Sequence, residues 1–164
     1  MIESQYLNAL RKICIQLSDC QNNWVITGSL GMALQGMEIK IHDIDIQTNK
    51  HGAYEIESLF SQYVVKTVHF SASEQIRSHF GSLEIGGVKV EIMGDIQKLL
   101  GNRVWEEPVK VEKYRHWISF EGMQVPVLSL EYEYQAYLKL GRIEKAEKIK
   151  KWLEENRLRN VRAG

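Results

Sequence analysis

Two aspartates separated by one residue are the clearest candidates for chemistry in this chain. Asp43 and Asp45 lie in the segment 41–47, where they alternate with Ile44 and Ile46. On a β-strand, residues i and i+2 point to the same face, about 6.6 Å apart along the backbone. Two carboxylates about 4 Å apart repel by about 4 kcal/mol at an effective dielectric constant of about 20. The pattern therefore favours a bound cation, and Mg²⁺ typically takes one or two carboxylates together with substrate phosphates.

A Gly-Ser turn precedes the two aspartates. The apolar run 24–27 ends at Gly28-Ser29, and apolar residues then recur at helical spacing over 30–37. Glycine lets the backbone approach a phosphate closely, and the first N–H groups of a helix favour anions. An anion site and a cation site within 24–48 together indicate a nucleoside triphosphate, such as ATP, with its metal ions.

These residues resemble the signature of the nucleotidyltransferase superfamily, in which a hydrophobic residue with Gly-Ser precedes Asp-hydrophobic-Asp. Gly28-Ser29 and Asp43-Ile44-Asp45 carry the resemblance, although the gap between them is longer than in many members. The likeness is to the small-molecule branch, which includes lincosamide and aminoglycoside nucleotidyltransferases, and to toxin-type nucleotidyltransferases. It implies transfer of a nucleoside monophosphate from a triphosphate to a hydroxyl of a small-molecule acceptor. It also implies two Mg²⁺ ions held by Asp43 and Asp45, and a triphosphate held by Gly28 and Ser29.

The superfamily usually supplies a third carboxylate from a strand beside the Asp-x-Asp strand. Glu91 is the candidate, in the alternating segment 88–93 that follows the hairpin signal Gly86-Gly87. Many relatives have Asp at this point, and Asp95, just past the predicted strand, is the alternative. Glu91 would serve as a metal ligand or as a general base, unless it is an exposed strand residue paired with a neighbouring lysine.

A lysine near the C-terminus is a candidate phosphate ligand. The segments 125–129 and 137–142 are similar to the C-terminal helices of small nucleotidyltransferases, in several of which a lysine reaches the phosphates. Lys139 is the matching position, with an ordinary surface lysine as the alternative. Relatives often carry a Lys-Asp pair just after the Arg, whereas here Lys145 is followed by Ala146.

Three other functions compete with a small-molecule nucleotidyltransferase. The missing Lys-Asp pair favours a catalytically inactive nucleotide- or partner-binding relative, whereas the presence of all three acids disfavours it. A toxin-type nucleotidyltransferase would act on RNA or protein. A phosphohydrolase is disfavoured because His42-Asp43 lies in a strand pattern, whereas the His-Asp dyads of metal-dependent phosphohydrolases lie on helices.

Composition restricts the partners. The 164 residues carry 21 basic and 21 acidic side chains, and extended nucleic-acid binding needs clustered Lys and Arg. The basic run 145–162 is amphipathic and is interpreted as a solvated helix face. Cys14 and Cys20 lack metal-site spacing, and neither a signal peptide nor a long apolar segment occurs. We therefore expect a cytoplasmic protein without a membrane partner. A homodimer is implied only by the resemblance, since small relatives often complete the acceptor pocket with a second subunit.

The elements that must position these residues form an α/β pattern. The resemblance implies a mixed, mostly antiparallel sheet flanked by helices, with a nucleotidyltransferase core over 1–128. A short helical segment over 129–164 is expected to pack on the same domain. The segment 49–52 is expected to be a turn, 71–80 is ambiguous with a short helix as one option, and Leu99 and Leu100 suggest a short helix. Periodicity and turn signals predict helices over 4–20, 30–37, 53–61, 130–140 and 143–159, and strands over 24–27, 41–47, 63–70, 83–85, 88–93, 114–120 and 123–127.

Overall fold

The computed structural model describes residues 1–163, with side chains described up to residue 157. The chain forms two compact units, Met1–Leu128 and Ser129–Gly164. The first unit contains the seven-stranded sheet and helices α1 to α3, and the second contains helices α4 and α5. That the C-terminal helices pack on the core stays a prediction.

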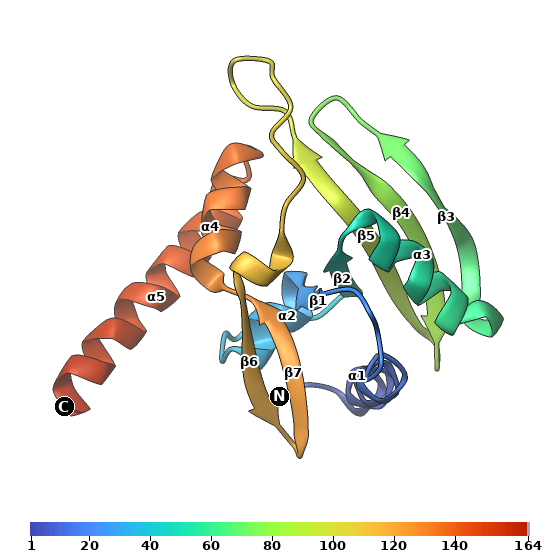
Figure 1. Cartoon of the computed structure of the whole chain (residues 1–164). Helices are drawn as coiled ribbons and strands as arrows, with labels where there is room; N and C mark the ends of the chain where they lie inside the picture. The colour runs from blue at the N-terminus through green and yellow to red at the C-terminus, as the bar shows by residue number, and fades with distance from the viewer. Residues whose placement is uncertain (164) are drawn as a thin grey trace. The chain divides into compact units, whose positions relative to one another are not determined.

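A mixed sheet forms the first unit, with its strands in the spatial order β3-β4-β5-β2-β1-β7-β6 (Figure 1). The pairs β1/β7 and β2/β5 are parallel, and the other neighbours are antiparallel. This confirms the mixed, mostly antiparallel sheet. The strands are β1 (Trp24–Thr27), β2 (Ile44–Thr48), β3 (Val64–Ala72), β4 (Ile76–Ile85), β5 (Val88–Lys98), β6 (Arg115–Phe120) and β7 (Met123–Leu128).

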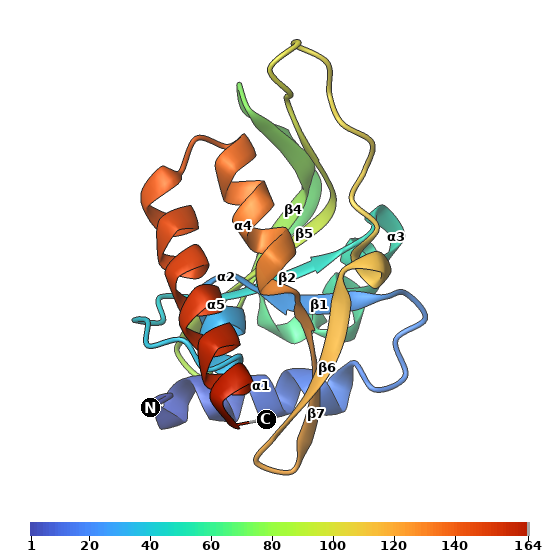
Figure 2. The same cartoon turned by 90° about the vertical axis from the view of Figure 1, so that its left-hand side faces the viewer.

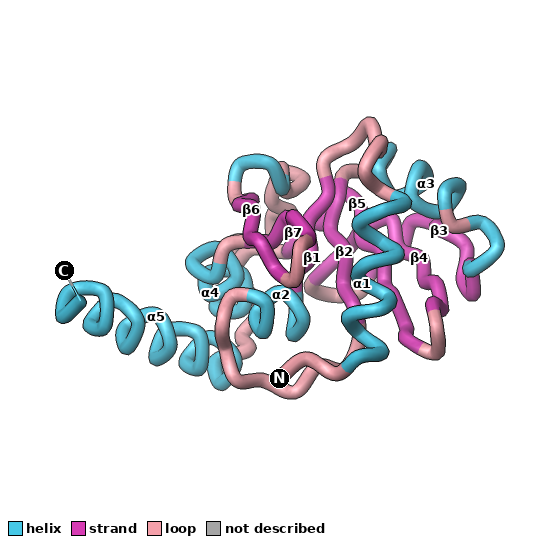
Figure 3. The backbone as a smooth tube through the Cα atoms, turned by 90° about the horizontal axis from the view of Figure 1, so that it is seen from below, coloured by secondary structure: helices cyan, strands magenta, loops and turns pink. Residues whose placement is uncertain are grey.

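Two helices cover the apolar face of this sheet. In β2, Ile44 is fully buried whereas Asp45 is only half-buried, so the strand has one apolar face and one polar face. Helix α1 (Ser4–Gln16) lies across one face of the sheet (Figure 3). It buries Leu10 in the same core. Helix α3 (Lys50–Leu59) packs on β3, β4 and β5.

Helix α3 lies close to β5 because residue 94 has no side chain. A Cβ on Gly94 would lie 2.8 Å from the Cβ of Ala53 and 2.6 Å from the carbonyl oxygen of Asn49. Gly94 therefore faces α3, and successive strand residues point to opposite faces. Glu91 and Met93 consequently point to the other face of the sheet, away from α3.

Three predicted boundaries near the candidate site are wrong, the first being that of the helix predicted over 30–37, which spans Gly28–Leu34 and so includes the predicted Gly-Ser turn. Strand β2 begins at Ile44 rather than at residue 41, so Asp43 lies in the loop directly before the strand. The predicted turn at 49–52 is the first turn of α3, because the Asn49 side chain accepts a hydrogen bond from the Gly52 N–H at 2.7 Å. An Asn at this position is a common N-cap.

The region between β3 and the second hairpin also differs from the prediction. The ambiguous segment 71–80 contributes the end of β3 and the start of β4, which begins at Ile76, so the helical option is wrong. The Gly86-Gly87 hairpin is confirmed, with Ile85 paired to Val88. Strand β5 continues to Lys98 instead of ending at residue 93.

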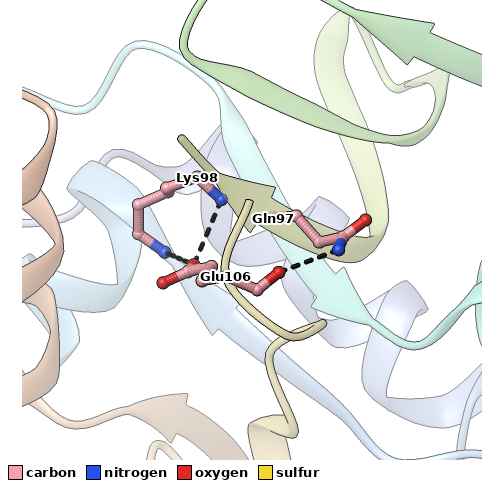
Figure 4. Close-up of polar contacts among 3 residues, drawn as sticks. All are labelled: Gln97, Lys98 and Glu106. Carbon is pink, nitrogen blue, oxygen red and sulfur yellow. Dashed lines mark hydrogen bonds and ion pairs between the residues drawn. The ribbon is translucent and has the colours of Figure 1, made fainter. Parts of the chain in front are cut away.

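A long loop follows β5 and extends beyond the end of the strand (Figure 2). The expected short helix at Leu99 is wrong, because Leu99 forms an isolated bridge with Trp105. Lys98 Nζ lies 2.8 Å from Glu106 Oε1, and the Lys98 N–H donates to the same oxygen at 3.2 Å. The Gln97 amide donates to the Glu106 carbonyl oxygen at 2.8 Å (Figure 4). These contacts hold the returning loop against the end of β5.

Both cysteines are free and partly buried. Burial raises the pKa of the Cys14 thiol to about 11 and is the largest cause of the rise of the Cys20 pKa to about 11. The Cys14 side chain packs against the hydrophobic core. Both groups are therefore expected to stay as unreactive thiols at neutral pH.

The second unit is helical. Helix α4 (Leu130–Lys139) begins after Ser129, whose Oγ accepts a hydrogen bond from the Tyr132 N–H at 3.2 Å, and this confirms the predicted cap. Helix α5 runs over Ile143–Ala163. Among the described residues, no helix has both the length and the apolar character that a membrane-spanning segment needs.

Candidate active site

Four polar residues lie in one row across the middle of the sheet. The register pairs Thr27 of β1 with Asp45 of β2, Asp45 with Glu91 of β5, and Glu91 with Ser82 of β4. Paired residues on neighbouring strands point to the same face, and this face is the one opposite α3. The two carboxylates are half-buried, whereas Thr27 and Ser82 at the ends of the row are buried.

The predicted glycine corner lies directly against this row. Gly28 begins the short helix α2 (Gly28–Leu34) with φ +68°, a conformation that favours glycine. A Cβ at this position would also collide with Oδ2 of Asp45. The backbone at Gly28 and the carboxylate of Asp45 are therefore as close as the predicted site requires.

Ser29 connects the corner to the loop that carries Asp43. Its Oγ accepts a hydrogen bond from the His42 N–H at 3.3 Å. His42 and Asp43 are adjacent in the chain, so this bond holds the loop before β2 near the start of α2. Ser29 thus has a role in positioning the loop, and phosphate binding by its hydroxyl stays a prediction.

Lys89 forms an ion pair with one of the three candidate acids. Its Nζ is 2.9 Å from Oε1 of Glu91, two residues along the same strand. The hydrogen bond to Glu91 and the negative charges of Glu91, Asp43 and Asp45 raise the pKa of Lys89 above its ordinary value. The ammonium group is therefore charged and serves as the counter-ion of this acidic face.

The ion pair shows that one of the sequence alternatives for Glu91 describes a real contact, since Glu91 is paired with a neighbouring lysine. Its position beside Asp45 is equally clear from the register. Asp95 lies farther along β5, beyond Gly94, which is the register partner of Thr48. Of the two candidates for the third carboxylate, Glu91 is thus the one next to Asp45.

The donor set fits Mg²⁺ in chemical type, because carboxylate oxygens are its preferred protein ligands. No group of three or more His, Cys, Asp or Glu side chains is arranged to hold a metal ion in the part of the chain that the structure describes. Oε1 of Glu91 lies 2.9 Å from the Lys89 ammonium nitrogen. Metal binding by Asp43, Asp45 and Glu91 stays a prediction.

Lys139 is the last residue of α4 and its side chain is exposed. It belongs to the second unit, so its role as a phosphate ligand also stays a prediction.

Sequence reasoning missed two members of this row. Thr27 and Ser82 gave no signal, because their place in the row depends on strand register between distant segments. The neighbouring lysine that the sequence offered as a partner of Glu91 is Lys89, which lies two residues before Glu91 and shares its face of the strand.

The fold and these residues define a nucleotidyltransferase, and comparison with known proteins agrees. The sequence model of the aminoglycoside-2''-adenylyltransferase family matches residues 9–151. The chain belongs to this family. No curated protein sequence matches it significantly.

Solved structures give the same assignment. The chain is 59% identical to a presumed nucleotidyltransferase from Thermotoga maritima, with a TM-score of 0.84 over 94% of this chain and 96% of that one. Two antibiotic-modifying enzymes share the fold at 14% identity. They are ANT(2'')-Ia in complex with adenylyl-2''-tobramycin, with a TM-score of 0.61 over 98% and 96% of the two chains, and the lincomycin-bound lincosamide adenylyltransferase LnuA, with a TM-score of 0.56 over 92% and 97%.

Proposed function

We propose that this nucleotidyltransferase transfers a nucleoside monophosphate from a triphosphate to a hydroxyl of a small molecule, with Mg²⁺ bound by Asp43, Asp45 and Glu91. The observation that carries the proposal is the register pairing of Asp45 with Glu91 beside Gly28. In this pairing two carboxylates share one face of the sheet, and one of them lies directly against the backbone of Gly28.

An antibiotic-like acceptor and an ATP donor are the first substrates to test. The family is that of aminoglycoside-2''-adenylyltransferases, and two enzymes with this fold carry adenylylated tobramycin or lincomycin. The balanced charge of the chain, with 21 basic and 21 acidic residues, supports a small acceptor over a large RNA.

The proposed reaction forms a bond between the acceptor oxygen and the α-phosphorus and breaks the bond from that phosphorus to pyrophosphate. The hydroxyl proton leaves to Glu91 or to water. Bound Mg²⁺ would supply positive charge to the phosphates and lower the pKa of the acceptor hydroxyl. The remaining work of the protein is positioning and electrostatic stabilisation, as in phosphoryl transfer generally. Gly28 and Ser29 would hold the triphosphate beside the carboxylates, and Lys139 would neutralise part of its charge.

The test is a screen of four radiolabelled nucleoside triphosphates against pooled aminoglycosides, lincosamides and simple polyols with Mg²⁺. Transfer of label together with release of pyrophosphate supports the proposal. Asp45→Asn is expected to reduce turnover by at least about 10²-fold, comparable to the loss of one preorganised electrostatic group. An Asp45→Asn enzyme that turns over at the wild-type rate would remove Asp45 from the catalytic site.

A nucleotide-binding module without turnover is the second candidate. The ion pair between Lys89 and Glu91 favours it, because a permanently paired Glu91 could not serve as a metal ligand or a base. Thermal shift with each nucleotide and Mg²⁺ separates the candidates. Stabilisation by a nucleotide without pyrophosphate release from any acceptor indicates the module.

A further inference from the structure

We propose that Lys89 is a positioning residue that competes with the metal for Glu91. The inference rests on the proposed function, since it concerns the same carboxylates. In the absence of metal, the Lys89 ammonium group holds Glu91, and binding of a divalent cation must break this ion pair.

The direction in which Lys89 reaches supports this role. Its register partner on β4 is Glu84, which is exposed and directly opposite. Directly opposite residues of unlike charge commonly pair across strands. Lys89 Nζ instead lies 2.9 Å from Glu91, along its own strand. The ammonium group is thus placed on the side of the acidic row rather than over its cross-strand neighbour.

The charge arrangement gives a physical reason for this placement. Asp45 and Glu91 are directly opposite each other on neighbouring strands, and like charges in this position are destabilising. Asp43 adds a third negative charge in the loop just before β2. A cation on this face therefore offsets the repulsion between the carboxylates, and Lys89 supplies one such cation.

Exposure makes the ion pair easy to break. The Lys89 side chain is 57% exposed and that of Glu91 is 23% exposed, and exposed ion pairs contribute little to stability. A divalent ion carries twice the charge and can bind several carboxylates together. The lysine consequently protects the acidic face without preventing metal binding, and its main effect is to weaken metal affinity.

Binding of Mn²⁺, measured by the loss of the free-ion EPR signal, tests the proposal without any turnover. Removing Lys89 as Lys89→Gln is expected to tighten Mn²⁺ binding about three- to fivefold, the size expected for one exposed ion pair. Lys89→Arg keeps the pair and should bind Mn²⁺ like the wild type. Unchanged or weaker binding by Lys89→Gln overturns the proposal.

Lys50→Gln is the matched control. Lys50 is an exposed lysine on α3, which covers the opposite face of the sheet. The Lys50→Gln substitution removes the same charge from the protein as Lys89→Gln does. Tighter Mn²⁺ binding in this variant as well would show an effect of net charge and overturn the proposal.

A double variant separates competition for Glu91 from repulsion through space. If Lys89 acts by holding Glu91, then Lys89→Gln should no longer tighten Mn²⁺ binding in a Glu91→Gln background. An equal gain in both backgrounds would assign the effect to repulsion alone and overturn the competition.

Asp45→Asn distinguishes the two proposals. Loss of Mn²⁺ binding in Asp45→Asn, with no change in Lys89→Gln, keeps the proposed site and rejects the role of Lys89. Wild-type Mn²⁺ binding by Asp45→Asn rejects the site itself. Circular dichroism and thermal unfolding of each variant ensure that only folded proteins are compared.

Discussion

Gly28 shows how one residue can serve the backbone and the site together. Its φ of +68° favours glycine, and its missing side chain leaves room for Oδ2 of Asp45. Either constraint alone would favour glycine at this position. The positive φ and the lack of a side chain at Gly28 thus link the turn after β1 to the position of Asp45 on β2.

Gly28→Ala is expected to reduce both stability and activity. Placing a Cβ in the left-handed region costs about 1–2 kcal/mol, and the collision with Asp45 must be relieved by moving the carboxylate. Misplacing a reacting group by about 1 Å can cost about 10²-fold in rate. Urea unfolding and the transfer assay measure the two effects.

Gly122→Ala is the matched control for backbone strain. Gly122 has φ +78°, but a Cβ there would meet nothing within 4 Å. The control should lose a similar amount of stability and retain activity. Equal activity losses in both variants would show that the contact between Gly28 and Asp45 has no special role.

The site illustrates what could be predicted at the residue scale. The alternation of acids with isoleucines indicated Asp43 and Asp45, and a Gly-Gly hairpin placed Glu91 on a strand. The pairing of Asp45 with Glu91 needed strand register, which joins segments far apart in the sequence. Such pairing is decided by packing of the whole sheet, and local pattern carries little information about it.

At the scale of elements, the end of β5 and its returning loop form a buried ionic clasp. The Lys98 side chain is 4% exposed and that of Glu106 is 12% exposed. Glu106 also accepts the Lys98 N–H, so the clasp closes the loop on the strand. Periodicity gave no signal for it, because it depends on one lysine in a strand and one glutamate in an irregular loop.

Lys98→Met is expected to destabilise the fold by about 3 kcal/mol, because breaking a buried pair leaves the other charge uncompensated. Lys98→Met combined with Glu106→Gln should recover part of this loss, since no charge is then left buried. Urea unfolding of the two variants provides the test. A double variant that is less stable than the single one would contradict this account.

The start of α3 shows why sequence patterns do not always locate the ends of helices and strands. The sequence 49–52 has the composition of a turn, but the same Asn serves as an N-cap, so the turn and the start of α3 coincide. The ends of strands β6 and β7 were predicted to within one residue, because the turn at Gly122 and the alternation of apolar and polar residues mark where these strands begin and end. Strand β4 was predicted only over 83–85, because the segment 71–80 combines polar, charged and apolar residues without regular alternation.

At the scale of the molecule, the contacts divide the chain after Leu128. The first unit contains the whole sheet, including β7, which pairs with both β1 and β6. The second unit contains Lys139 and the basic helix α5. A homodimer remains a prediction from the resemblance, and a cytoplasmic location remains a prediction from the composition.

A chain that stops after Leu128 is expected to fold cooperatively, because every strand keeps its partners. A chain that stops after Gly122 loses β7, leaves β6 unpaired and exposes the side of β1 that β7 covers, so it should not fold. Circular dichroism and urea unfolding of the two fragments test this. A first fragment without a cooperative transition would show that the sheet depends on the C-terminal helices.

The parallel pairing of β2 with β5 has a consequence for how the protein forms. Strands β3 and β4 and helix α3 lie between the two in sequence, so the strands can meet only after this intervening chain is arranged. Contacts between distant segments close slowly, because the loop entropy is lost before the contact is gained. The β4–β5 hairpin can thus form early with Glu91 in place, while the aspartates join it in one of the last steps of folding. A nascent or partly folded chain would then carry no assembled catalytic row.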